Sequence, residues 1–142
     1  MTGSVRFALL GMLIALPACR DVTAPKNVSD AEALWRSKNI SSYVFTGSKA
    51  CFCLDASPVM VTVIDDKVVR VADLETGAIR ANDSWYTIDQ FFDRLASGTW
   101  HPRTLAFDET LGYPTTIEIC CIEDDSGVIY KVSNLGQVAF VE

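Results

Sequence analysis

Residues 59–71, VMVTVIDDKVVRV, decide the fold of this chain. Valines recur at every second position before the Asp65-Asp66 pair and resume after it, which is the pattern of two strands that each bury one face. Aspartates suit the tight turn between them, because Asp tolerates turn conformations and forms local hydrogen bonds. The stretch therefore predicts an antiparallel β-hairpin, with a core face formed by Val59, Val61, Val63, Val69 and Val71.

Alternating apolar residues predict further strands on both sides of this hairpin. Residues 74–86 read as a long loop, and residues 111–114 and 124–127 read as turns. The residues expected to share a face of each strand are Tyr43 and Phe45; Leu105 and Phe107; Ile117, Ile119 and Cys121; Val128, Tyr130 and Val132; and, in a last short strand, Val138 and Phe140.

Two capping boxes, each a Ser or Thr followed three residues later by Glu or Gln, predict two helices. The first opens at Ser29, ends near Asn39, and has Ala31, Leu34 and Trp35 on one face. The second opens at Thr87 and ends before Gly98. Its apolar stripe has the helical spacing i, i+3, i+4, i+7 and consists of Ile88, Phe91, Phe92 and Leu95.

Two helices and six or seven antiparallel strands predict an α+β domain with the helices packed on one face of the sheet. Each half reads helix, strand, strand, strand. Pro58, Val61 and Val63 recur 56 residues later as Pro114, Ile117 and Ile119. Two α-β-β-β repeats and a chance alignment of short strand patterns both fit this correspondence.

Residues 7–19, FALLGMLIALPAC, predict export and lipid anchoring. The uncharged run after Arg6 is too short to span a bilayer but fits the apolar core of a signal peptide. A small residue before Cys19 is typical of a lipoprotein signal, and the alternative is an ordinary secretory signal that leaves Cys19 as a free thiol. We expect a signal peptide over residues 1–18, a lipidated Cys19 with a tether over 19–28, and a single domain over 29–142. Because residue 20 is Arg rather than Asp, the periplasmic face of the outer membrane is the favoured location.

The charge of the chain argues against some partners. The full sequence has 12 basic and 18 acidic residues, and loss of Arg6 with the signal leaves a net charge of −7. Nucleic acid requires a basic surface, so we expect no nucleic-acid partner. The acidic balance also argues against binding to anionic lipid beyond the anchor itself.

Four cysteines remain after lipidation: Cys51, Cys53, Cys120 and Cys121. An exported compartment favours disulfides, and strand alternation puts the first pair on one face and the second pair on opposite faces. Structural cross-links between the two pairs are the favoured reading. Separate local bonds, a redox-active pair and a soft-metal site are the alternatives.

No catalytic set is evident in the sequence. His101, the only histidine, reads as a loop or edge residue, and the acidic pairs 65–66, 108–109 and 123–125 fall at predicted turns, where Asp is common for structural reasons. We expect no catalytic residue, no bound cofactor and no metal site. Aromatic residues near predicted loops either form a binding patch or close the ends of the core; they are Trp85, Tyr86, Trp100 and Tyr113.

The order and spacing of several motifs resemble an uncharacterised family of bacterial lipoproteins that carry a domain of unknown function. Its marks are Cys-Phe-Cys near the start and Leu-Gly-Tyr-Pro near the end, here Cys51-Phe52-Cys53 and Leu111-Gly112-Tyr113-Pro114. The pair Cys120-Cys121 is outside that pattern. Further matching positions include Trp35, Tyr43, Phe45, Pro58, Gly77, Thr87, Ile88, Asp89, Phe91, Phe92, Phe107, Asp108, Asp124, Asp125, Tyr130 and Ser133.

The resemblance implies an exported lipoprotein domain with no established activity. Taken with the residues, it favours a non-enzymatic module that binds a protein or a cell-envelope component while lipid on Cys19 holds it at the membrane. The alternatives are a thiol redox or soft-metal protein that uses Cys51 and Cys53, a secreted-type inhibitor, and a hydrolase that uses His101 or the acidic pairs.

Overall fold

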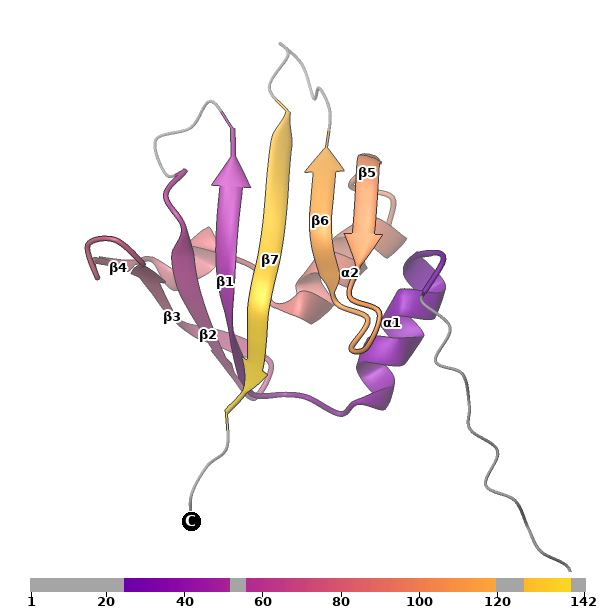
Figure 1. Ribbon diagram of the computed structural model, residues 1–142, viewed down its shortest axis with the longest axis horizontal. Helices are drawn as coiled ribbons and strands as arrows, with labels where there is room; N and C mark the ends of the chain where they lie inside the picture. The colour runs from indigo at the N-terminus through magenta and orange to yellow at the C-terminus, as the bar shows by residue number, and fades with distance from the viewer. Residues whose placement is uncertain (1–24, 52–55, 120–126, 139–142) are drawn as a thin grey trace, which may run out of the picture.

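The computed structural model describes residues 25–51, 56–119 and 127–138. Within this part of the chain, two α-helices and a seven-stranded antiparallel sheet form an α+β fold, as predicted (Figure 1). The strand order is β4-β3-β2-β1-β7-β6-β5. The elements are α1 Val28–Ser37, β1 Tyr43–Ala50, β2 Val59–Ile64, β3 Lys67–Asp73, β4 Ile79–Arg80, the 3₁₀ turn η1 Asn82–Ser84, α2 Ile88–Ala96, β5 Pro102–Phe107, β6 Pro114–Ile119 and β7 Val128–Gln137.

Both helices lie on one face of the sheet, behind it in the view of Figure 1. The core lies between the two layers, because every second strand residue points towards the helices. Tyr43 and Phe45 on β1 are buried, as are Ile117 and Ile119 on β6. The opposite face of the sheet has no helix over it in the described residues.

The β2–β3 hairpin forms as predicted, and its turn uses both aspartates. Asp65 and Asp66 have φ of 47° and 60°, and the residues that flank them, Ile64 and Lys67, pair across the hairpin. A two-residue turn with both φ positive matches the right-handed twist of the strands.

A bulge in the β2–β3 ladder corrects one predicted core residue. The register shifts between Thr62 and Val63, so Val63 lies opposite Val68 and Thr62 opposite Arg70. Val68 therefore packs against the core, whereas Val69, predicted on the core face, is 45% exposed. A bulge inserts one unpaired residue, and strict alternation in the sequence does not reveal it.

The first helix begins two residues earlier than predicted and has a different cap. Asn27 is extended, with φ −151°, and its side chain accepts a hydrogen bond from the Asp30 amide at 2.9 Å. Ser29, the predicted cap, lies inside the first turn of α1. Asn is at least as good a cap as Ser. Asn27, two residues before Ser29, takes the cap position, and the predicted capping box does not form.

The second helix follows its sequence signals closely. Thr87 and Gln90 form the predicted capping box, and the four residues of the apolar stripe are buried. Gly98 has φ +70°, as expected of a residue just beyond a helix end. The amide of Ile88 donates a hydrogen bond to the Tyr43 hydroxyl at 2.9 Å, which fixes the start of α2 to β1.

The end of the chain and the predicted long loop differ from expectation. β7 continues as one strand to Gln137 past Asn134, at φ 52°, so no separate strand begins at Val138 in the described residues; Phe140 lies outside them. Residues 74–86 contain the short strand β4 and the turn η1. The helix-then-three-strands order is present in each half, with β4 added to the first.

Neither helix suits a membrane span. α1 has 10 residues and α2 has 9. Across the described residues, no helix is long and apolar enough to cross a bilayer.

Candidate functional site

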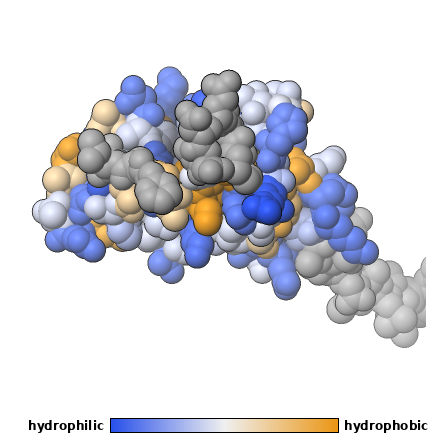
Figure 2. Space-filling view, turned by 90° about the horizontal axis from the view of Figure 1, so that it is seen from above, coloured by the Kyte–Doolittle hydropathy of each residue, from blue (hydrophilic) through white to orange (hydrophobic). Residues whose placement is uncertain are grey.

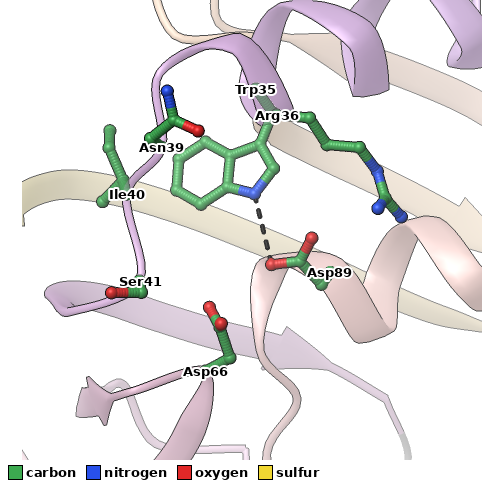
Figure 3. Close-up of a pocket in the computed structure, with 7 residues that line it drawn as sticks. All are labelled: Trp35, Arg36, Asn39, Ile40, Ser41, Asp66 and Asp89. Carbon is green, nitrogen blue, oxygen red and sulfur yellow. Dashed lines mark hydrogen bonds between the residues drawn. The ribbon is translucent and has the colours of Figure 1, made fainter.

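A hollow of about 390 Å³ opens where the loop after α1, the β2–β3 turn and the start of α2 meet (Figure 3). Residues from both halves of the chain line it. They are Trp35, Arg36, Asn39, Ile40, Ser41, Asp66 and Asp89.

Trp35 forms the apolar wall of this hollow. The ring is only 2% exposed and meets Tyr43 edge-on, with 5.3 Å between ring centroids. Its indole N–H points to an oxygen of Asp89 at 3.4 Å, as the dashed line in Figure 3 shows. Asp89 lies in the first turn of α2, where the helix dipole favours a negative charge. Packing of α1 on the core therefore places the Trp35 ring beside the Asp89 carboxylate of α2.

Asp66 supplies a second carboxylate to the same hollow. Its backbone amide donates to the Ser41 carbonyl at 2.9 Å and so ties the hairpin turn to the loop after α1. Partial burial, together with the negative charges of Asp89 and Asp65, raises the pKa of Asp66 above its usual value. Among the described residues, its carboxylate has no hydrogen bond and no ion pair.

The one basic side chain at this hollow is already paired. Arg36 is 57% exposed and forms an ion pair with Glu32 at 2.7 Å, one turn earlier on α1. That hydrogen bond raises the pKa of the guanidinium, to which the charges of Asp89 and Asp93 also contribute. The hollow is therefore acidic overall, with an aromatic wall and polar groups from Asn39 and Ser41.

The predicted aromatic patch is only partly assembled. Trp85, Tyr86 and Trp100 come together, but Tyr113 lies against Trp35 instead. Trp85 is 3% exposed, Trp100 8% and Tyr113 7%, so these three rings do not form one exposed surface. They close the ends of the core, because each large ring buries most of its area against other rings.

A groove of about 590 Å³ runs along α2 beside this cluster and includes Trp85 and Tyr86. The Arg94 guanidinium lies 4.2 Å from the centroid of the Tyr86 ring and so covers part of it. Burial of Tyr130 in the same cluster raises the pKa of its hydroxyl to about 12. The aromatic rings here are engaged in packing, so we regard the groove as a weaker site than the acidic hollow.

The remaining candidates are dispersed. His101 is exposed just before β5, and Asp108 accepts two backbone amides, from Thr110 and Leu111, as a turn residue. Cys51 follows β1 and is half-buried; Cys19, Cys53, Cys120, Cys121 and the 123–125 acids lie outside the described residues. Within the described ranges, no three His, Cys, Asp or Glu side chains are grouped to hold a metal ion.

The fold and the hollow define a small two-layer α+β domain with an acidic hollow beside Trp35. Residues 27–137 match the model of a family of unknown function, DUF6174. The chain belongs to this family. No curated protein and no solved structure matches it.

The sequence does not predict that Asp66 and Asp89 line the same hollow. Asp66 was assigned to a turn, and Asp89 lay in the first turn of a predicted helix. The sequence shows that each aspartate lies in a well-defined local structure. It does not show the tertiary arrangement that brings both aspartates to the hollow beside Trp35.

Proposed function

We propose that this protein is an exported, lipid-anchored, non-enzymatic module that binds a protein or cell-envelope component, and that the acidic hollow receives a positively charged group of that component. Lipid on Cys19 would hold the module at the periplasmic face of the outer membrane. The observation that carries the binding site is the Asp66 carboxylate, which faces the hollow beside Asp89 without a partner among the described residues.

Electrostatics favour a cation at this position. Two carboxylates near one another repel, and a positive charge between them relieves that repulsion. Trp35 and Ile40 add an apolar wall against which the stem of a lysine or arginine can pack. A protonated amine or a guanidinium on a protein partner is therefore the group that fits best. A protein that this module inhibits would be one such partner.

A titration with N-acetyl-lysine methylamide tests this proposal on the full chain. The indole N–H of Trp35, observed by NMR, reports binding at the hollow. Removal of one carboxylate by Asp66→Asn should weaken binding about 3–10-fold, in line with roughly 1 kcal/mol for a partly exposed charge pair. Glu109→Gln removes an exposed negative charge at a distant turn and is the matched control.

The pH dependence gives a second readout. Because the pKa of Asp66 is raised, wild-type binding should weaken as pH falls through that value, and Asp66→Asn should lose this dependence. If Asp66→Asn and Glu109→Gln bind the probe equally well, the hollow is not the site.

We propose a structural role for the cysteines. Cys51 is the one cysteine in the described residues, where it is half-buried at the end of β1 and has an interaction partner. A redox or soft-metal function would need a thiolate at this position, since the thiolate is the reactive and metal-binding form. Intact mass after alkylation, before and after mild reductant, separates the two: resistant bonds support a scaffold, whereas a readily reduced Cys51 supports thiol chemistry.

A further inference from the structure

The open face of the sheet carries an apolar row on β2, β3 and β4, which Thr46 on β1 extends. Thr46 on β1 lies opposite Met60 on β2, Met60 opposite Ala72 on β3, and Ala72 opposite Ile79 on β4. Directly paired residues share a face, and the neighbouring row, with Phe45, is the buried one. Met60 is 45% exposed and Ile79 62% exposed, both unusually open for large apolar side chains.

Basic residues surround this row. The register places Arg70 opposite Thr62, Lys67 opposite Ile64 and Lys131 opposite Ser48, all on the open face. All three are exposed. None of their side chains has a hydrogen bond or an ion pair among the described residues.

The charge of the open face is opposite to that of the chain as a whole. Among the paired strand residues on this face, Glu118 is the single acid, and its carboxylate is hydrogen-bonded to the Thr104 hydroxyl at 2.5 Å. The chain as a whole has net charge −6. In the described part of the chain most acidic residues lie on the helices or at turns, so the open face differs in sign from the chain as a whole.

We infer that the open face of the sheet lies against an anionic lipid bilayer, with the Met60–Ile79 row entering the interface and the three basic residues meeting lipid phosphates. Cationic residues flanking an apolar strip are what an interfacial surface requires. Figure 2 shows apolar surface at the end of the molecule that carries β3 and β4. The acidic hollow lies on the helix side and stays open to a partner in this orientation.

The length of the chain before α1 permits this orientation. Residues 20–27 reach at most about 28 Å when extended, which exceeds the thickness of about 10–12 Å that a helix layer adds to one face of the sheet. An anchor at Cys19 could therefore hold either face towards the bilayer. The inference concerns which face turns to the lipid and goes beyond the binding role proposed for the hollow.

Fluorescence quenching by brominated lipid tests the orientation on the full chain in vesicles. An environment-sensitive fluorescent amino acid replaces Ile79 on the open face or, as a matched control, the exposed Ala33 on α1. In vesicles of phosphatidylcholine with phosphatidylglycerol, we expect clear quenching at position 79 and little at position 33. In phosphatidylcholine alone, quenching at position 79 should fall.

Two variants separate charge from apolar contact. The triple variant Lys67→Glu, Arg70→Glu, Lys131→Glu tests the charges. It should lower the equilibrium constant for binding of the open face to the bilayer about 100-fold or more, given the usual contribution of a basic residue near an anionic surface. Met60→Ser, studied with the label at position 79, should reduce it about threefold to tenfold. Lys38→Glu, an exposed charge reversal at the end of α1, should leave it unchanged. Circular dichroism verifies that each variant is folded.

Three results would overturn the inference. These are equal quenching at positions 79 and 33, equal quenching with and without phosphatidylglycerol, and a signal at position 79 that rises with protein concentration in the absence of vesicles, which identifies a second copy as the occupant. Each leaves the proposed function of the acidic hollow to its own test.

Discussion

Replacing Gly112 with alanine should destabilise the protein much more than the same change at two other glycines with similar backbone angles. Gly112 has φ +85°, and a Cβ built on it would lie 2.5 Å from the Ala31 carbonyl oxygen of α1. It would also lie 3.0 Å from the Leu34 Cβ and from the Trp35 amide nitrogen. Two of these three atoms are backbone, so no side-chain rotation relieves the contact.

Gly77 and Gly98 provide the matched controls. Their φ values are +71° and +70°, and a Cβ at either would meet no atom within 4 Å. Alanine there carries only the backbone penalty, about 1–2 kcal/mol. At Gly112 the steric contact adds about 1–3 kcal/mol, the usual range for overpacking. The expected loss in free energy of unfolding at Gly112 is therefore about 2–5 kcal/mol.

Thermal unfolding followed by circular dichroism measures the difference. For a domain of this size 1 kcal/mol corresponds to about 4–8 °C in Tm, so Gly112→Ala should melt at least about 5–10 °C below the two controls. Since the clash lies under α1, the Trp35 indole resonance at the hollow should also shift. Equal melting temperatures for the three variants would refute the claim that close helix–turn contact requires Gly112.

Two further perturbations test other parts of the scaffold. Tyr43→Phe removes the acceptor of the buried Ile88 amide and should cost about 1–3 kcal/mol in urea unfolding, whereas Tyr113→Phe should cost less; equal losses would contradict this role of the Tyr43 hydroxyl. The pKa of Asp73 is lowered to about 2, first by a hydrogen bond from the Thr76 amide and next by the hydrogen bond from Arg80. The stabilising effect of the Asp73 carboxylate should therefore be present above about pH 4 and be lost as pH falls towards 2. Asp73→Asn should therefore be less stable at neutral pH and show a flatter acid-unfolding profile; an unchanged profile would exclude this carboxylate as a contributor.

The elements that were predicted well are those whose signals are local. The Asp65-Asp66 turn and the capping box at Thr87 are short-range patterns, and neither depends on what the rest of the chain does. The prediction for the start of α1 was wrong because Asn27 and Ser29 are both good caps, and the local pattern does not choose between them. The prediction that Val69 faces the core was wrong because a bulge shifts the strand alternation by one residue, and no sequence motif indicates this bulge.

The candidate site could not be read in the same way. The sequence predicts Trp35 on the apolar face of the first helix and Asp66 in a turn, and both local predictions are correct. Their convergence with Asp89 depends on the hydrogen bond from Asp66 to Ser41 and on the docking of α1, which involve residues far apart in the sequence. For the aromatic patch, the sequence shows large rings near predicted loops but does not show that most of these rings are buried.

The net charge of a small domain is a poor guide to its partners when its two faces differ in sign. From the sequence, an excess of acidic residues argued against contact with anionic lipid. The strand register changes that argument, because it gathers Lys67, Arg70 and Lys131 on one face and leaves Asp66 and Asp89 on the helix side. At physiological salt, charges are screened beyond about 8 Å, so a bilayer would respond mainly to the face it meets. The same separation would let one domain rest on lipid and bind a cationic partner at the same time.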